Sequence, residues 1–218
     1  MKTALVFGSS GLVGNHLVRL LNKNSTYKKI KLFVRSTSEI KTSKIEIINT
    51  DFNNLSNHKE DINGDDCFFC IGTTKKNTPD KDEYRRIEYD IPVEIAKIAK
   101  SNSINSFFYV SSGFADSKSS SAYLKNKGQV EEELIKLNFS ILGIMRPSFL
   151  VGNRKEKRPG EEVGIFFFKI FSPLLLGPLK KMRPIKSEKV AKVMIKVANE
   201  NLKKTIFESN EIAELALN

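Results

Sequence analysis

The residues of this sequence best suited to chemistry are Tyr123 and Lys127, four positions apart in Tyr123-Leu124-Lys125-Asn126-Lys127. On a helix this spacing puts both side chains on one face. A tyrosine hydroxyl there gives a proton to a substrate oxygen or takes one from it, while the nearby ammonium lowers the pKa of such a tyrosine. Ser111 and Ser112 end the apolar run before this helix, and a serine hydroxyl at that strand end orients the same oxygen.

The spacing alone is not specific in a lysine-rich chain. Tyr27 also has a lysine four positions on, Lys31, but that pair is predicted to run from a loop into a strand, where it serves no such purpose. Only the context separates the two pairs. Tyr123 and Lys127 follow a strand and a Ser-Ser pair, on a helix expected to lie beside a nicotinamide ring.

A glycine-rich turn near the start of the chain predicts a dinucleotide site. The apolar run Ala4–Phe7 leads into Gly8-Ser9-Ser10-Gly11-Leu12-Val13-Gly14, and apolar residues at helical spacing follow. Glycines at a strand–helix junction let the backbone turn tightly and approach a pyrophosphate. The phosphates then lie at the positive end of the helix. The spacing Gly-x-x-Gly-x-x-Gly departs by one position from the commoner Gly-x-Gly-x-x-Gly.

The end of the second strand favours NADP(H) over NAD(H). An NAD site usually has an acidic residue here for the ribose 2′-hydroxyl, but this chain has Arg35-Ser36. An arginine suits a 2′-phosphate and stacks on adenine. Asp51 and Phe52, after the third strand, are expected near the adenine edge.

Apolar runs and helical spacings alternate along the chain and predict its elements. Strands are expected at 4–7, 30–34, 45–48, 67–71, 105–110, 141–145 and 205–207, and helices after Gly11 and at 79–101, 119–137, 186–199 and 211–217. Pro92 lies inside the long second helix and is expected to kink it. Alternating strands and helices predict an α/β Rossmann-type fold, with a doubly wound parallel sheet covered on both faces.

The length favours one domain over residues 1–218. Residues 1–150 are expected to form the cofactor-binding core, 151–185 a small segment that covers the substrate, and 186–218 a helix-strand-helix. The apolar stretch Val163–Leu179 is interrupted by Lys169, Pro173 and Pro178, so it is too short to cross a membrane as a helix. This stretch is expected to form a lid over the substrate, and peripheral membrane contact or a dimer face are the alternative roles for it. The protein is expected to be a monomer or a homodimer.

The formal net charge of +11 does not predict nucleic-acid binding, because the lysines are spread along the chain and no recognition motif accompanies them. A solvated basic surface explains the charge. Met1-Lys2-Thr3 leads directly into the first strand without a secretory signal, so a cytoplasmic location is expected.

No metal site is expected. Cys67 and Cys70 form a Cys-x-x-Cys within an apolar run, where positions i and i+3 of a strand point to opposite faces, and no second cysteine pair completes a zinc site. The two histidines, His16 and His58, are predicted to be ordinary surface residues.

Several motifs together resemble the extended and atypical short-chain dehydrogenase/reductases. Within them the chain resembles the Tat-interacting oxidoreductase group of small NADPH-binding proteins over nearly its whole length. The motifs are Gly8–Gly14, Cys70-Ile71-Gly72-Thr73-Thr74, Tyr109-Val110-Ser111-Ser112, Tyr123 with Lys127, Lys127-Gly128-Gln129-Val130-Glu131, Arg146-Pro147-Ser148 and Arg158-Pro159-Gly160-Glu161.

The resemblance implies a role for each of these positions. Ser112, Tyr123 and Lys127 would be the catalytic triad, with Ser111 the second choice of serine. The implied cofactor contacts are Gly8, Ser9, Ser10, Gly11, Leu12, Val13 and Gly14 at the turn, Arg35, Ser36, Asp51 and Phe52 at the adenosine, and Ile71, Gly72, Thr73, Ser111, Tyr123, Lys127, Pro147 and Ser148 toward the nicotinamide. Ser148 stands where the group commonly has glycine.

These observations predict an NADPH-dependent reductase of a small carbonyl compound whose identity the sequence does not reveal. A protein that binds NADPH as a sensor without catalysis is the alternative. A nucleotide-sugar epimerase or dehydratase is a second alternative, although the region after Arg146 is short for the substrate domain of such enzymes.

Overall fold

The computed structural model describes residues 1–35, 42–152, 177–200, 202 and 204–217. The main strands are β1 (Lys2–Phe7), β2 (Tyr27–Val34), β3 (Ile45–Asn49), β4 (Asp66–Phe69), β5 (Ser106–Val110), β6 (Ile141–Arg146) and β9 (Ile206–Glu208). The longer helices are α1 (Leu12–Lys23), α3 (Ile91–Ser101), α4 (Ala122–Lys136) and α6 (Ser187–Glu200). The shorter elements are η1 (Leu55–His58), α2 (Lys81–Arg85), η2 (Arg86–Asp90), β7 (Leu150–Val151), η4 (Gly177–Met182), β8 (Ile185–Lys186) and α7 (Ser209–Leu215).

The seven main strands form one parallel sheet in the order β3-β2-β1-β4-β5-β6-β9. This order confirms the Rossmann-type doubly wound fold. The strand order reverses between β1 and β4, and ligands of such sheets bind in the crevice at the carboxyl ends of the strands on either side of that point. β7 and β8, which the sequence does not predict, pair in a separate two-stranded sheet.

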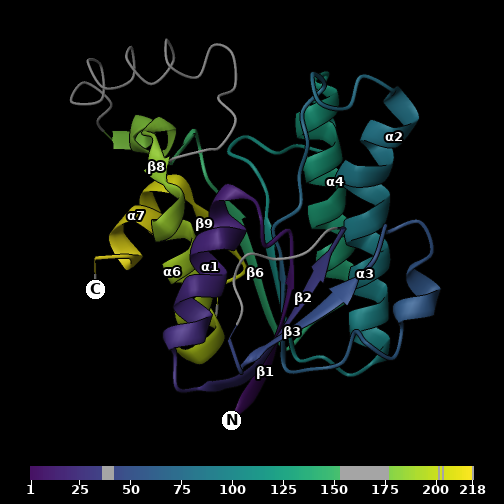
Figure 1. Cartoon of the computed structure of the whole chain (residues 1–218). Helices are drawn as coiled ribbons and strands as arrows, with labels where there is room; N and C mark the ends of the chain where they lie inside the picture. Colours follow the sequence, from purple (N-terminus) through teal and green to yellow (C-terminus); the bar gives the residue numbers. More distant parts are fainter. Residues whose placement is uncertain (36–41, 153–176, 201, 203, 218) are drawn as a thin grey trace.

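Helices cover both faces of the sheet, α1 and α6 on one side and α3 and α4 on the other (Figure 1). Strand β1 shows why both faces are apolar. Ala4 and Val6 point into the cluster shared with α1 and α6, whereas Leu5 and Phe7 point into the cluster shared with α3 and α4. The period-two alternation of a strand therefore builds two cores from one apolar run.

Some element bounds differ from the sequence prediction. β4 ends at Phe69, so Cys70 lies beyond it, and β2 begins at Tyr27, so that Tyr27 and Lys31 share one strand rather than a loop and a strand. The helix predicted over 79–101 is divided into α2, the π-helical turn η2 and α3. Pro92 stands at the start of α3, where its missing N–H removes the hydrogen bond that would continue an α-helix across this point.

Three predictions fall outside the described residues. They are Ser36 as a cofactor contact, most of the apolar stretch proposed as a lid, and the Arg158–Glu161 motif. Within the described part of the chain, no helix has the length and apolar character needed to cross a bilayer.

Candidate functional site

Two glycines make the turn between β1 and α1 possible. Gly8 has a φ of +86°, and a Cβ atom there would lie 2.7 Å from the carbonyl carbon of Cys70. A Cβ atom on Gly14 would lie 2.1 Å from the Gly8 carbonyl oxygen. The end of β1 therefore lies directly against the chain leaving β4, at the point where the strand order reverses.

The amino end of α1 is suited to an anion. Gly11 precedes the helix without a side-chain cap, and the first turn carries no acidic residue, so its free N–H groups attract negative charge. A Cβ atom on Gly11 would meet no backbone or side-chain atom closer than 3.4 Å, which leaves room beside the turn. The predicted pyrophosphate contacts Ser9, Ser10, Leu12 and Val13 all lie here. These observations fit a dinucleotide.

The residues predicted to contact the adenosine follow the neighbouring strands β2 and β3. Arg35 is exposed after β2, and Asp51 is exposed after β3. Hydrogen bonds from the backbone and side chain of Asn53 hold the pKa of Asp51 below its usual value. Phe52 has a φ of +62° and is buried, with its ring centroid 6.4 Å from that of Phe7.

Arg86 is a cation of this region that sequence reasoning missed. Its guanidinium donates to the Phe52 carbonyl oxygen over 3.0 Å and to both carboxylate oxygens of Glu83. Because Glu83 already neutralises Arg86, the exposed Arg35 stays the better candidate for a 2′-phosphate.

The predicted catalytic residues lie around the carboxyl end of β5, where Ser112 follows the strand and the Lys127 Nζ contacts the Val110 carbonyl oxygen. Tyr123 and Lys127 share one face of α4, with the Lys127 Nζ 6.0 Å from the centroid of the Tyr123 ring. Ser112 follows β5, and its hydroxyl makes only a long hydrogen bond, 3.3 Å, to the neighbouring Gly113 carbonyl. The Ser111 hydroxyl instead donates to the buried Glu131 carboxylate. Ser112 is therefore the serine more available to a substrate.

Lys127 is buried and forms an ion pair with Glu88. Its Nζ lies 3.0 Å from Glu88 Oε2, and the two side chains are 4% and 0% exposed. The same Nζ donates to the Val110 carbonyl oxygen over 3.3 Å and lies 4.8 Å from the Tyr109 ring centroid. Burial lowers the pKa of Lys127, but the Glu88 carboxylate together with Tyr109 and Tyr123 outweighs this effect and holds the pKa of Lys127 well above its ordinary value.

Glu88 also reaches the loop that leaves β4. Its Oε1 accepts a hydrogen bond from the Thr73 backbone N–H, and a Cβ atom on Gly72 would lie 3.5 Å from the same oxygen. The predicted cofactor residues Ile71, Gly72 and Thr73 therefore lie beside Lys127. Sequence reasoning missed Glu88; a signal was available, because this carboxylate interrupts the apolar face of the long helix.

Pro147 and Ser148 border the same region. The Gly113 N–H donates to the Pro147 carbonyl oxygen over 2.7 Å, which fixes this loop beside the one that carries Ser112. The Ser148 hydroxyl donates to the Arg183 carbonyl and lies 3.1 Å from the Ser209 hydroxyl. The serine thus ties the loop after β6 to the chain before β8 and to α7.

Next to this region, a partly buried network joins α4, β6 and β9, with Glu131 buried and Arg146 and Glu208 partly exposed. The Arg146 guanidinium pairs with the Glu131 carboxylate and, over 3.2 Å, with Glu208. The Ser111 hydroxyl donates to Glu131 from the end of β5. The network holds Ser111, and hence the strand end that carries Ser112.

An apolar rim lies beside Ser112. Phe114 is 49% exposed although its φ is +65°, and the Lys181 Nζ of η4 lies 5.1 Å from its ring centroid. Leu179, also in η4, is equally exposed. A bulky residue with positive φ is uncommon and is often found at functional sites.

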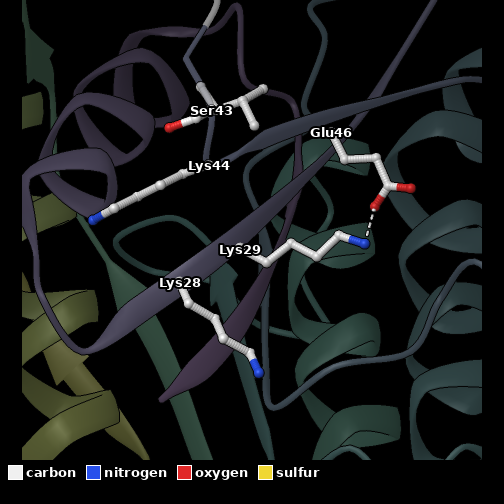
Figure 2. Close-up of a pocket in the computed structure, with 6 residues that line it drawn as sticks. Lys28, Lys29, Ser43, Lys44 and Glu46 are labelled. Carbon is white, nitrogen blue, oxygen red and sulfur yellow. Dashed lines mark ion pairs between the residues drawn. The ribbon is translucent and has the colours of Figure 1, made fainter.

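Other features of the described residues carry no chemistry of this kind. Figure 2 shows a pocket at the amino-terminal part of β2 and at β3, far from the carboxyl ends; Lys29 pairs there with Glu46, and the Lys44 Nζ donates to backbone carbonyls. Cys67 and Cys70 pack into different cores, as the strand pattern predicts. Burial raises the pKa of Cys70 to about 12. In the described ranges no acidic, histidine and cysteine side chains cluster as a metal site.

A protein-family model described as NAD(P)H-binding matches residues 8–201, which is most of the chain. This protein belongs to the NAD(P)H-binding family. Membership agrees with the glycine turn at Gly8 and the strand order, and it establishes a nicotinamide dinucleotide as the ligand class without deciding between NAD(H) and NADP(H).

Two curated relatives of this NAD(P)H-binding protein extend the comparison. Protein FMP52-1, mitochondrial, of Scheffersomyces stipitis is 30% identical over 228 residues, covering 98% of each chain. Protein HTATIP2 of Rattus norvegicus is 31% identical over 171 residues, covering 77% of this chain and 70% of its own. The resemblance to the Tat-interacting group is thereby confirmed.

Solved structures confirm the fold of the NAD(P)H-binding chain. The Bordetella bronchiseptica enzyme WbmH in complex with NAD+ superposes with a TM-score of 0.70 at 15% identity, covering 99% of this chain and 79% of its own. Vestitone reductase from alfalfa gives a TM-score of 0.67 at 15% identity, and the match covers 95% of this chain and 76% of the reductase. Both likenesses show a Rossmann-type fold.

The names of the fungal relatives contradict the expected cytoplasmic location, because FMP52-1 and several further FMP52 proteins are designated mitochondrial. The expectation rests on the lack of a secretory signal, and that argument has no bearing on import into mitochondria.

Proposed function

We propose that this protein is an NADPH-dependent reductase of a small carbonyl compound. The observation that carries the proposal is the position of Lys127, which lies close to both Tyr123 and the Gly72–Thr73 loop and contacts the Val110 carbonyl oxygen two residues before Ser112. We expect the family's dinucleotide to place its nicotinamide there. The mitochondrial designation of the fungal relatives favours a mitochondrial location for this chain too.

The chain's own residues account for proton transfer and orientation. When bound, NADPH supplies the hydride. The Tyr123 hydroxyl donates its proton to the substrate oxygen, and the Ser112 hydroxyl donates a hydrogen bond to the same oxygen. The Lys127 ammonium is fixed by its ion pair with Glu88, and it would bind the nicotinamide ribose. Phe114 and Leu179 favour an apolar substrate, because contact with their exposed surfaces removes apolar area from water.

The decisive experiment follows NADPH binding and turnover in the same preparation. NADPH affinity is measured by calorimetric titration, and NADPH oxidation is then followed at 340 nm with a panel of aldehydes and ketones. We expect binding and the reduction of at least one carbonyl, with deuterium transferred to the product from deuterated NADPH. Binding without transfer to any compound would instead establish a sensor, and a failure to bind would overturn the proposal entirely.

Arg35 is expected to decide the cofactor preference. Changing Arg35→Ala removes the predicted partner of the 2′-phosphate, and hydrogen bonds to charged groups contribute about 1.5–3 kcal/mol, so NADPH affinity is expected to fall roughly tenfold to hundredfold. NADH affinity should change little. Calorimetric titration with both cofactors measures the difference, with the exposed Arg19→Ala as the matched control. An equal loss for NADH and NADPH would contradict the assignment.

Phe114 is expected to set the preference for apolar substrates. In Phe114→Ala, KM for aromatic ketones should rise by about tenfold, in line with the burial of part of a phenylalanine side chain. KM for the smallest aliphatic ketones should stay near its original value. A thermal unfolding curve controls for folding, and an unchanged ratio of the two KM values would count against a substrate contact at Phe114.

A further inference from the structure

Apolar surface and positive charge lie together beside the predicted catalytic serine. The Lys181 Nζ of η4 lies 5.1 Å from the ring centroid of Phe114, which is two residues after Ser112 in the chain. The exposed apolar surface comes from Phe114 and from Leu179 in η4. Lys181 is exposed as well, and Arg183, just after η4, is partly exposed. We call Lys181 and Arg183 the basic rim.

Hydrogen bonds connect the basic rim to the loop that carries Ser112. The Arg183 carbonyl oxygen accepts from the Ser148 hydroxyl. The residue before this serine, Pro147, accepts from the Gly113 N–H over 2.7 Å. Arg183 is thus tied through the loop after β6 to the residue next to Ser112, and the contact of Lys181 with Phe114 joins the same two segments a second time.

Neither cation of the basic rim has a carboxylate partner in the part of the chain that the structure describes. The Nε of Arg183 is buried and has no hydrogen-bond partner there. The acidic residues closest in the chain are engaged elsewhere, because Asp116 accepts from the Lys118 N–H and Glu208 pairs with Arg146. A buried polar N–H without a partner is costly and uncommon. The basic rim is therefore suited to pair with an anion from outside the chain.

We propose that the substrate is a carbonyl compound with an apolar body and a carboxylate, which pairs with Lys181 and Arg183 while the apolar body covers Phe114 and Leu179. The proposal rests on the proposed function and names its substrate class. The planar guanidinium fork matches the two oxygens of a carboxylate. Because the Nε of Arg183 is withdrawn from water, its charge is screened less than that of the exposed Lys181, so Arg183 should contribute more to binding.

A local site differs in its behaviour from the general attraction of a basic protein for anions. The formal net charge of +11 draws every anion toward the surface, and the loss of any exposed lysine weakens that attraction equally. Pairing at the basic rim instead depends on Lys181 and Arg183 alone. The comparison of rim variants with the loss of a distant lysine therefore separates the two effects.

The test compares 4-oxo-4-phenylbutanoate with its primary amide, which has nearly the same shape without the charge. We expect kcat/KM for the acid, followed as NADPH oxidation, to exceed that for the amide by about tenfold. Arg183→Met should remove most of this ratio, and Lys181→Met should lower it by about threefold, in both cases through the acid. The matched control is Lys23→Met, which removes an exposed lysine from the far end of α1 and should leave the ratio unchanged.

Arg183→Lys keeps the test decisive if Arg183→Met does not fold. The lysine retains the positive charge and an aliphatic stem but loses the fork, so the acid-to-amide ratio should fall by about threefold. Thermal unfolding curves of all variants control for stability. A ratio that stays unchanged in both Arg183→Lys and Lys181→Met would overturn the proposal.

Binding is also measured without turnover, so that the carboxylate site and the reductase can fail separately. The probes are 4-phenylbutanoate and 4-phenylbutanol, which carry no reducible carbonyl, titrated calorimetrically into protein loaded with NADP+. We expect the acid to bind about tenfold more tightly, and less so at high salt. A preference for the acid that Arg183→Met removes, without reduction of any carbonyl, would support the carboxylate site and refute the reductase. Reduction of acid and amide with equal kcat/KM would overturn the carboxylate site and leave the reductase standing.

Discussion

Replacing Tyr123 by phenylalanine is expected to lower the rate of carbonyl reduction by a factor of about 10² to 10⁴, because it removes the general acid that protonates the substrate oxygen. NADPH affinity should stay within about twofold, since the ring remains beside Lys127 and general acid catalysis acts in the transition state. Single-turnover reduction, with NADPH affinity measured by titration in parallel, separates the two quantities.

The matched control is Tyr89→Phe. Tyr89 is half-buried in η2, and its ring lies 4.4 Å beneath the Arg85 guanidinium, which loses little when the hydroxyl is removed. We expect this variant to reduce carbonyls at the original rate. If Tyr123→Phe keeps more than about a tenth of the activity, the proton comes from another group and the proposed acid is wrong.

The sequence predicts the fold well because the signals for it are local. Period-two alternation in β1 and helical spacing after Gly11 identify elements from neighbouring residues alone, and the glycine turn fixes how the first two meet. The parallel sheet and its order then follow from few topological choices. The positions of Ser112, Tyr123 and Lys127 relative to these elements follow in the same way.

The partners of those residues are not local, and the sequence does not predict them. Glu88 reaches Lys127 from the π-helical turn η2, and the pattern across 79–101 can show a carboxylate on the apolar face but neither this turn nor the partner of the carboxylate. The contact from Ser148 to Arg183 joins segments far apart in the chain, through a hydroxyl at the position where the resembled group commonly has glycine. Ion pairs of this kind depend on which helix faces meet, and that is decided by packing of the whole fold.

Arg146 is the clearest case of such a long-range partner, and its loss should destabilise the protein. In Arg146→Met the Glu131 carboxylate, 4% exposed, loses its counter-charge and keeps only the Ser111 hydroxyl as a donor. Breaking a buried ion pair in this way costs about 3–5 kcal/mol. For a chain of this size the melting temperature Tm should fall by roughly 10 °C, measured by circular dichroism.

Two further variants show whether the buried charge is the cause. Lys136→Met breaks an exposed pair with Glu133, which should leave Tm nearly unchanged because water screens such a pair. Combining Arg146→Met with Glu131→Met leaves no buried charge and should recover most of the lost stability. If the double variant is as unstable as Arg146→Met, the loss comes from the packing of the arginine stem. If it is recovered, Glu131 needs Arg146 to stay charged inside the fold, and the Ser111 strand end depends on a pair contributed by α4 and β6.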